Sequence, residues 1–173
     1  MKKLVGLSLV LACTLACPAQ TPKPANGGHI FVVRHAEKIS ENADELSEQG
    51  KGRAACLATT LKNANIMTVI TSQFNRTQQT ATATADEFKV HLKPIKADDN
   101  AAIAQAARDA AKSGDVLIVG HSNTVPQIVK AIGNVDVIVG DTQYDQLFII
   151  DSAGVAQLLY CPAAAPGPES KMK

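Results

Sequence analysis

Short apolar runs alternate along this chain with longer segments in which apolar residues recur every three or four positions. Six runs are predicted as β-strands, because aliphatic residues dominate them and polar segments bound them. They lie at residues 29–33, 67–71, 90–95, 115–119, 146–150 and 155–160. Four of the intervening segments have the pattern of helices, and these are residues 47–63, 74–88, 100–112 and 124–132.

The alternation of strands with helices predicts the fold class. Strands separated by helices of this length are typical of α/β proteins, in which helices cover both faces of a parallel sheet. The last two runs are joined by the short sequence DSAG, so we expect them to pair as an antiparallel hairpin. The pattern predicts a three-layer α/β/α domain with a mostly parallel central sheet of about six strands. Ser47 is expected to cap the first helix.

The two ends of the chain differ in composition from its middle. Residues 1–16 begin with MKK and continue as an uncharged apolar segment, which is the pattern of a secretory signal and too short to span a membrane. Residues 17–28 are rich in Pro and Gly and are predicted as a linker. Residues 162–173 have the composition of a flexible tail. The predicted domain therefore spans residues 29–161.

The predicted signal implies export, with the bacterial periplasm as the expected location. Cys17 follows the sequence TLA and resembles the lipidated cysteine of a bacterial lipoprotein, so a membrane anchor through Cys17 is the alternative to free release. Cys56 and Cys161 remain in the domain. An oxidising compartment permits a disulfide between them, and two separate buried thiols fit the sequence equally well.

Composition excludes some classes of function. The chain has no Trp and 3% aromatic residues, so aliphatic side chains must supply its core. The formal net charge is +1, and no basic stripe with interleaved aromatic residues indicates a nucleic-acid-binding protein. A metal site of His35, His121 and an aspartate is conceivable, but no spacing typical of metal ligands supports it. We expect no metal and no cofactor.

Basic side chains follow three of the predicted strands at the point where each strand ends. Arg34 and His35 follow the first run, Arg76 lies shortly after the second, and His121 follows the fourth. Ligands of open α/β sheets bind beyond the carboxyl ends of the strands, so we expect these four side chains to converge. Two guanidinium groups and two imidazoles suit a dianion such as phosphate. A helix that begins near Asn123 would add the positive end of its dipole.

A histidine in such a site has a specific chemistry available. Neutral imidazole is a nucleophile that can attack phosphorus and form a covalent phosphohistidine, while arginines stabilise the charge on the phosphoryl oxygens. The other two histidines of the domain, His29 and His91, have no partner motif and are predicted as structural or surface residues.

Four motifs, in this order, resemble those of the histidine phosphatase superfamily, which has the phosphoglycerate mutase-like fold. FVVRHAEK resembles the Arg-His-Gly signature, with Ala36 in place of glycine, and LSEQGKGRA resembles the opening of the first helix. TSQFNRTQQTA resembles the segment with the second arginine, and LIVGHSNTVPQIV resembles the segment with the second histidine. The resemblance covers residues 29–160.

The resemblance implies roles for the four basic side chains. His35 would be the nucleophile that becomes phosphorylated, and Arg34, Arg76 and His121 would form the phosphate pocket. Asn123, at the start of the helix whose dipole points at the site, is predicted from its position as a further phosphate-binding residue. The family also uses a carboxylic acid to protonate the leaving group, commonly from the loop that follows the strand after the second arginine.

In this chain that loop has the sequence KADDN, which offers Asp98 and Asp99 as the proton donor. Glu37, close to the predicted nucleophile, is a local alternative. Its other interpretation is an ion pair with Lys38 or with a neighbouring loop.

The expected function is a phosphoric monoester hydrolase of the histidine acid phosphatase type. Its substrate would be a phosphomonoester or phosphoramidate, carried by a small molecule or by a phosphoprotein. Little chain between residues 68 and 115 is left to cover the site, which favours a phosphatase over a mutase. Two alternatives are a phosphate-binding domain without catalysis and a mutase-like phosphotransferase. A serine hydrolase based on Ser122 is disfavoured because no histidine follows it.

Overall fold

The computed structural model describes residues 27–161. The predicted signal, Cys17, residues 17–26 of the predicted linker and the predicted tail lie outside the described residues. Between residues 27 and 161, no helix combines the length and the apolar character needed to cross a membrane.

All six predicted strands and all four predicted helices are present close to their predicted bounds. The strands are β1 (Ile30–Arg34), β2 (Ile66–Thr71), β3 (Leu92–Pro94), β4 (Asp115–Gly120), β5 (Gln146–Asp151) and β6 (Gly154–Leu159). The helices are α1 (Glu48–Leu61), α2 (Asn75–Phe88), α3 (Asn100–Ala111) and α4 (Val125–Gly133). Ser47 caps α1 as predicted, since its hydroxyl accepts a hydrogen bond from the amide of Gly50 at 3.1 Å.

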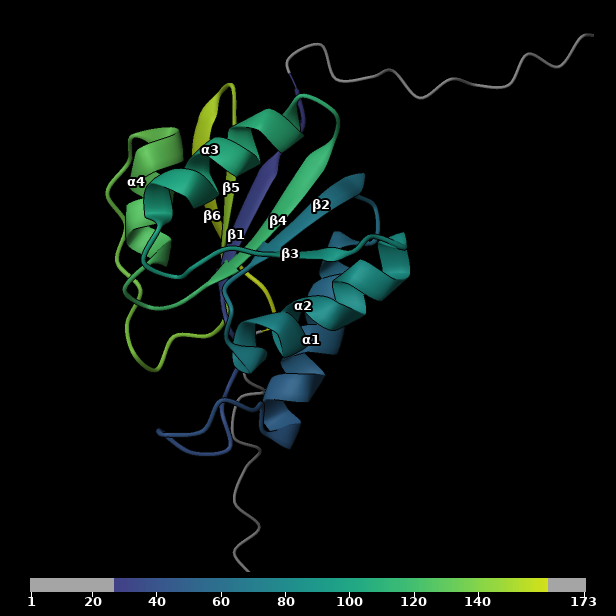
Figure 1. Cartoon of the computed structure of the whole chain (residues 1–173), viewed down its shortest axis with the longest axis vertical. Helices are drawn as coiled ribbons and strands as arrows, with labels where there is room; N and C mark the ends of the chain where they lie inside the picture. Colours follow the sequence, from purple (N-terminus) through teal and green to yellow (C-terminus); the bar gives the residue numbers. More distant parts are fainter. Residues whose placement is uncertain (1–26, 162–173) are drawn as a thin grey trace, which may run out of the picture.

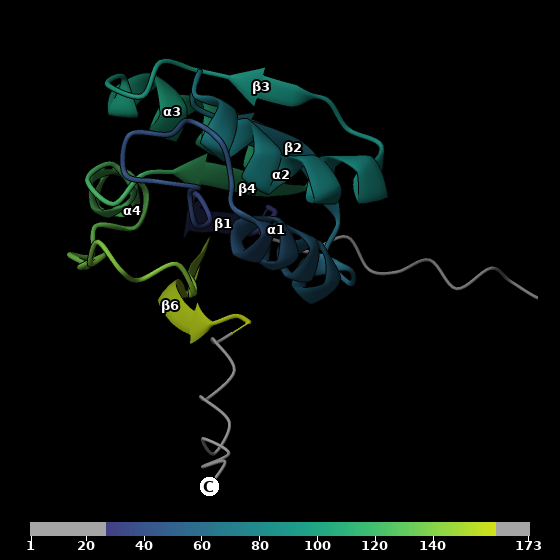
Figure 2. The same cartoon turned by 90° about the horizontal axis from the view of Figure 1, so that it is seen from below.

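The strands form one sheet in the order β3-β2-β4-β1-β5-β6. Strands β3, β2, β4 and β1 pair in parallel, whereas β5 runs antiparallel to β1 and forms the expected antiparallel hairpin with β6. Figure 2 shows β3 and β6 at the two opposite edges of this sheet. The predicted mostly parallel α/β/α fold is confirmed.

Helices cover both faces of the sheet, with α1 and α2 on one side and α3 and α4 on the other (Figure 1). Alternation along β1 explains this arrangement, because successive side chains of a strand point to opposite faces. Ile30 and Val32 belong to the apolar cluster that includes Ile128 of α4, whereas Phe31 and Val33 belong to the cluster that includes Leu57 of α1. The central strands are therefore buried on both faces along most of their length and are rich in aliphatic residues.

The parallel strands end at one level of the sheet. In the registers, Arg34 of β1 is opposite Gly120 of β4, and Thr71 of β2 is opposite Val119 of β4. Residues that directly follow β1, β2 and β4 therefore emerge side by side at the same edge. Helix α2 begins shortly after β2 and α4 shortly after β4, so their amino-terminal ends lie at this edge as well.

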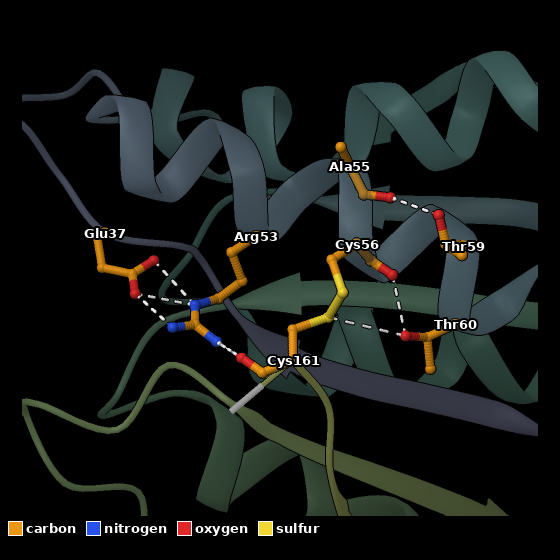
Figure 3. Close-up of a disulfide and its surroundings, with 7 residues drawn as sticks. All are labelled: Glu37, Arg53, Ala55, Cys56, Thr59, Thr60 and Cys161. Atoms are coloured by element: carbon orange, nitrogen blue, oxygen red, sulfur yellow. Dashed lines mark hydrogen bonds and ion pairs between the residues drawn. A yellow bond between two sulfur atoms is a disulfide. The ribbon is translucent and has the colours of Figure 1, made fainter. Parts of the chain in front are cut away.

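A disulfide links Cys56 of α1 to Cys161, which follows β6, with Cα atoms 6.3 Å apart (Figure 3). This decides between the two alternatives that the sequence left open. The same close-up shows Arg53 between the disulfide and Glu37: its Nη1 donates to the carbonyl oxygen of Cys161 at 2.7 Å, and its Nη2 donates to the Glu37 carboxylate at 2.6 Å. The end of the described chain is thus tied to α1 and to the loop after β1.

Candidate active site

The basic side chains predicted at the strand ends lie together in the structure. Arg34, His35, Arg76 and His121 line one cavity of about 440 Å³, and Asn123 lines it as well. The two imidazole rings are 5.4 Å apart between centroids. Five further residues complete the lining: Lys38, Glu41, Ser122, Asp141 and Tyr144.

His35 is held rigidly at the carboxyl end of β1. Its amide donates to the carbonyl of Gly120 at 2.9 Å, which extends the pairing with β4 by one residue. Its ring Nδ1 lies 2.8 Å from the carbonyl oxygen of Ala36, an acceptor, so Nδ1 is the protonated nitrogen. The lone pair is therefore on Nε2, which has no hydrogen-bond partner among residues 27–161. Burial, with smaller contributions from the charges of neighbouring arginines, lowers the pKa of His35 to about 3, so the ring is neutral near pH 7.

The loop that follows His35 packs closely against α1 and α2. The amide of Ala36 donates to the hydroxyl of Thr80 in α2 at 2.9 Å. Gly50 lets the backbone of α1 lie directly against the carbonyl of Glu37, because any Cβ at this position would overlap that carbonyl. This is the physical reason for the glycine in the LSEQG motif.

His121 is also neutral, and its tautomer follows from its partners. Arg76 Nη2, which can only donate, lies 3.4 Å from Nδ1, so Nδ1 accepts and Nε2 carries the hydrogen. Nε2 is 3.0 Å from the hydroxyl oxygen of Ser72 and donates to it. Burial and then the charges of Arg76 and Arg34 lower the pKa of His121 to about 4. Ser72, at the end of β2, orients this ring and was not predicted from the sequence.

Each arginine of the site is held through both terminal nitrogens: Arg34 Nη2 donates to the Tyr144 hydroxyl at 3.5 Å and Arg76 Nη2 to His121 Nδ1 at 3.4 Å, in addition to the bonds of Nη1. Arg34 Nη1 donates to the carbonyl of Gly140 at 2.9 Å, and its guanidinium lies over the ring of Tyr144 at 4.2 Å. Arg76 Nη1 donates to the Asp44 carboxylate at 2.8 Å. In both arginines Nε is buried without a hydrogen-bond partner among the described residues. Two guanidinium groups and two neutral imidazoles around one cavity are an arrangement that suits a bound oxyanion.

Asp44 is the most informative residue that the sequence interpretation missed. Its carboxylate accepts from the amide of Asn75 at 2.9 Å, which caps the amino-terminal end of α2, and it holds the Arg76 side chain at the same time. Burial alone would raise the pKa of Asp44, but these amides and the Arg76 charge outweigh burial and lower it. The charged carboxylate therefore fixes Arg76, through Nη1, in the wall of the cavity.

Tyr144 and Asp141 reach the site from the loop that precedes β5. The sequence shows no motif there, and their position depends on β5 pairing with β1 at the neighbouring edge of the sheet. Asp141 and Tyr144 offset part of the effect of burial, which lowers the pKa of Arg34.

The three candidate proton donors occupy different environments. Asp98 lines a second cavity, of about 410 Å³, which also has Arg76 in its wall. Asp99 caps α3, since its Oδ1 accepts from the amide of Ala102 at 2.9 Å, and it lines neither cavity. Of these two aspartates, only Asp98 lines a cavity together with Arg76.

Glu37 is engaged elsewhere. Arg53 Nε lies 2.9 Å from both carboxylate oxygens, and the side chains of Glu37 and Arg53 are only 13% and 7% exposed. Burial tends to raise the pKa of Glu37, but the hydrogen bonds from Arg53 dominate and lower it, so this carboxylate holds no proton near pH 7. The interpretation of Glu37 as a member of an ion pair is correct, although its partner is Arg53 and not Lys38.

The remaining histidines lie apart from the site. His29 precedes β1 at the opposite end of this strand, where its Nδ1 is 3.1 Å from the Asp115 carboxylate, and His91 is exposed. Within the part of the chain that the structure describes, no three His, Cys, Asp or Glu side chains are grouped to hold a metal ion.

Comparison with known proteins agrees with this geometry. The family model described as histidine phosphatase superfamily (branch 1) matches residues 30–101, which include Arg34, His35, Arg76 and Asp98. No curated protein matches the chain significantly.

Solved structures with the same fold carry several activities. The protein histidine phosphatase SixA complexed with tungstate is 16% identical, with 76% of this chain and 95% of that chain covered and a TM-score of 0.59. A phosphoglycerate mutase from Bacillus anthracis is 17% identical over 78% and 92% of the two chains, with a TM-score of 0.60. A mycobacterial glucosyl-3-phosphoglycerate phosphatase is 13% identical over 77% and 97%, with a TM-score of 0.57. At these identities the likeness establishes the fold.

Proposed function

With the resemblance to the histidine phosphatase superfamily confirmed by the family model and by the fold, we propose that this protein hydrolyses phosphomonoesters or phosphoramidates through a phosphohistidine on His35. The observation that carries the proposal is the combination of side chains in the cavity and the neutral form of His35. A neutral imidazole whose Nε2 has no partner among the described residues shares one cavity with the guanidinium groups of Arg34 and Arg76.

In the first step, the Nε2 lone pair of His35 attacks phosphorus. A P–N bond forms, the bond from phosphorus to the leaving group breaks, and the leaving group departs with the bonding electron pair. The hydrogen bond from Nδ1 to the Ala36 carbonyl keeps the ring in the reactive tautomer and stabilises the positive charge that develops on it. Arg34 and Arg76 bind the phosphoryl oxygens. Their guanidinium groups are already in position before the reaction begins, so little reorganisation of the site is needed to stabilise the transition state.

Asp98 is proposed as the acid that protonates the leaving group. It lies in the cavity next to Arg76 and His121, whereas Asp99 and Glu37 are engaged in a helix cap and an ion pair. In the second step water attacks phosphorus and passes a proton to the Asp98 carboxylate. The P–N bond breaks, its electron pair returns to His35, and phosphate leaves.

Two comparisons support a phosphatase. The SixA structure holds tungstate, a tetrahedral oxyanion like phosphate, and the mycobacterial neighbour is named a phosphatase. A phosphoglycerate mutase has the same fold, so a mutase-like phosphotransferase is the alternative, and analysis of the products distinguishes it from a phosphatase.

Export to the periplasm is proposed together with this activity. The signal-like pattern of residues 1–16 and the disulfide between Cys56 and Cys161 support it, because disulfides persist in oxidising compartments. Attachment through a lipidated Cys17 is proposed as the mode of membrane association, and mass analysis of the protein purified from membranes tests it.

Hydrolysis of para-nitrophenyl phosphate tests the proposed activity. Its good leaving group reduces the need for an acid, so we expect release of nitrophenolate and inorganic phosphate by the wild type and none by His35→Ala. His91→Ala, which changes an exposed histidine, is the matched control and should retain activity. Absence of cleavage of this and of other phosphate esters between about pH 4 and pH 8 would favour a phosphate-binding domain without catalysis. Transfer of phosphate to an added acceptor in place of release would favour a mutase.

A further inference from the structure

The peptide group between Ala36 and Glu37 controls the state of the proposed nucleophile. Its carbonyl oxygen accepts a hydrogen bond from Nδ1 of His35 at 2.8 Å, and this bond keeps the lone pair of the ring on Nε2. The amide of Ala36 is fixed by the hydroxyl of Thr80 at 2.9 Å. Whatever fixes Glu37, at the other end of this peptide group, therefore also fixes the tautomer of His35.

Glu37 is held through both its main chain and its side chain. Its carbonyl oxygen accepts from the amide of Ser47 at 2.9 Å. Its carboxylate accepts from Nη2 of Arg53 at 2.6 Å and from Nε at 2.9 Å. Burial raises the pKa of this carboxyl, whereas the hydrogen bonds from Arg53 and from the amide of Glu37 itself lower it. The carboxylate therefore links Arg53 to the peptide group that orients His35.

Arg53 has a second anchor just after β6. Its Nη1 donates to the carbonyl oxygen of Cys161 at 2.7 Å, so its buried guanidinium group bridges Cys161 and Glu37 (Figure 3). Cys161 has a φ of 48°, in the left-handed region that residues with a side chain rarely adopt. Such a conformation persists only where the surrounding structure holds it. Here the disulfide to Cys56 and the hydrogen bond from Arg53 hold it.

A continuous series of contacts thus leads from the disulfide to the nucleophile. If the disulfide opens, Cys161 can leave the left-handed conformation, and its carbonyl oxygen moves away from Nη1 of Arg53. Because a buried guanidinium group that loses an acceptor is costly, the Arg53 side chain would turn toward another acceptor or toward water. The Glu37 carboxylate, paired with this side chain, would move with it.

The groups proposed to bind phosphate do not depend on this series of contacts. Nη1 of Arg34 donates to the carbonyl of Gly140, and Nη1 of Arg76 donates to the carboxylate of Asp44. Opening the disulfide should therefore slow the attack by His35 while the binding of phosphate is retained. This difference separates a role in positioning the nucleophile from a general loss of structure.

We propose that Arg53 is a positioning residue for the nucleophile and that the Cys56–Cys161 disulfide holds it in place, so that the rate of hydrolysis depends on the oxidised state of the protein. This rests on the proposed phosphatase function and specifies its regulation. The enzyme would have low activity in a reducing compartment and full activity in an oxidising one.

The reductant that opens the disulfide is a dithiol. Cys56 and Cys161 are both half-buried, so a dithiol can reach them. One thiolate of the dithiol attacks a sulfur atom, the S–S bond breaks, and the second thiolate resolves the mixed disulfide. The two cysteines gain two electrons and two protons, and the dithiol is oxidised to a disulfide.

Kinetics of the full chain with para-nitrophenyl phosphate, with and without dithiothreitol, test this inference. Reduction should lower kcat/KM about tenfold, the effect of about one hydrogen bond, and reoxidation should restore it. The inhibition constant of inorganic phosphate should stay within about twofold, because the phosphate-binding arginines keep their anchors. Far-UV circular dichroism at the assay temperature establishes whether the reduced protein is folded.

Two control variants separate the disulfide from other effects. The double variant Cys56→Ala/Cys161→Ala should have the kcat/KM of the reduced wild type and should not respond to dithiothreitol. Asp115→Ala removes the acceptor of the amides of His29 and Asn65 at the opposite end of the sheet, so it lowers stability away from the site. It should keep the wild-type kcat/KM and the wild-type response to dithiothreitol.

Arg53→Lys tests the positioning role with the disulfide intact. Its ammonium group keeps the charge but cannot bridge the Glu37 carboxylate and the Cys161 carbonyl as the guanidinium fork does. We expect kcat/KM to fall about tenfold again, with inhibition by phosphate unchanged. Nitrogen NMR of the histidine rings gives the direct signature. His35 should be protonated on Nδ1 in the oxidised wild type, whereas Arg53→Lys and the reduced wild type should contain both tautomers.

The outcomes separate this inference from the proposed function. Equal kcat/KM values for the folded oxidised and reduced wild type would overturn the coupling to the disulfide. A lower kcat/KM with His35 still protonated on Nδ1 alone would overturn the positioning role. If reduction unfolds the protein, Arg53→Lys decides, and wild-type kinetics in this variant would overturn the proposal. Failure of the oxidised wild type to cleave para-nitrophenyl phosphate would refute the phosphatase itself.

Discussion

Replacing His35 with Asn or His121 with Gln should change how the stability of the folded protein depends on pH. Both imidazoles are buried, with exposed fractions of 4% and 8%, and burial lowers their pKa values to about 3 and about 4. In the unfolded chain each would titrate near its ordinary pKa of about 6.5. Below this pH the unfolded chain binds two protons that the folded site does not, so acidification favours unfolding.

The size of the effect follows from these pKa values. Between about pH 7.5 and about pH 5 each imidazole should account for a loss of about 2 kcal/mol in the free energy of unfolding, or about 4 kcal/mol for the pair. Most of this stability is present above pH 6.5, and it continues to be lost until the pH falls through the folded pKa values. Each single variant should therefore have a pH dependence weaker than that of the wild type by about 2 kcal/mol over this interval.

Urea unfolding at the two pH values, followed by far-UV circular dichroism, measures this difference. The quantity compared is the difference in the free energy of unfolding between the two pH values, so the direct effect of each substitution on stability cancels. His91→Gln is the matched control, because His91 is exposed and its replacement should leave the wild-type dependence unchanged. If His35→Asn and His121→Gln retained the wild-type dependence within about 0.5 kcal/mol, the two rings would not be buried in the neutral state, and the reasoning would fail.

Three further predictions concern the surroundings of the site. Cys161→Ser removes a disulfide that spans 105 residues. In chemical denaturation its free energy of unfolding should be about 3–5 kcal/mol lower than that of the oxidised wild type and equal to that of the reduced wild type. Arg53→Met should destabilise the fold by about 3–5 kcal/mol because it leaves Glu37 charged and buried, and adding Glu37→Gln should recover part of the loss; no recovery would contradict the ion-pair account. Asp44→Ala should lower kcat/KM about tenfold by releasing Arg76, and Asp44→Asn, which still accepts a hydrogen bond, should lower it less; equal losses would count against positioning.

The fold was predictable because its signals are local. Each central strand is a continuous apolar run, as strands buried on both faces must be, and each helix has a stripe of small or aliphatic residues. The position of β5 and β6 beside β1 was not predictable, because the hairpin signal fixes only their mutual pairing. Tyr144, which reaches Arg34 from the loop before β5, was missed for that reason.

The candidate site was predictable where it follows the strand ends. Arg34 is the last residue of a parallel strand, and His35, Arg76 and His121 each come shortly after one, so the topology of the sheet alone brings them together. Asp44 could not be identified in the same way. It lies in an irregular loop, and its contact with Arg76 depends on how that loop folds over the start of α2.

The different environments of the candidate proton donors could not be predicted from the sequence either. The sequence offers Asp98 and Asp99 as equivalent neighbours, and the structure shows that Asp99 caps α3 whereas Asp98 lines a cavity. Glu37 likewise could not be excluded before its partner Arg53, sixteen positions along the chain, was located beside it.

The central claim is a covalent phosphohistidine on His35, and rapid quenching tests it most directly. Wild-type protein mixed with para-nitrophenyl phosphate and quenched in alkali within the first turnovers should carry one phosphoryl group. That group should be lost in mild acid and map to the peptide with His35. His35→Ala should carry none, and His121→Gln, which keeps the nucleophile, should still carry some. Turnover by the wild type without a trapped phosphoryl group, or a phosphoryl group that persists in His35→Ala, would contradict the account.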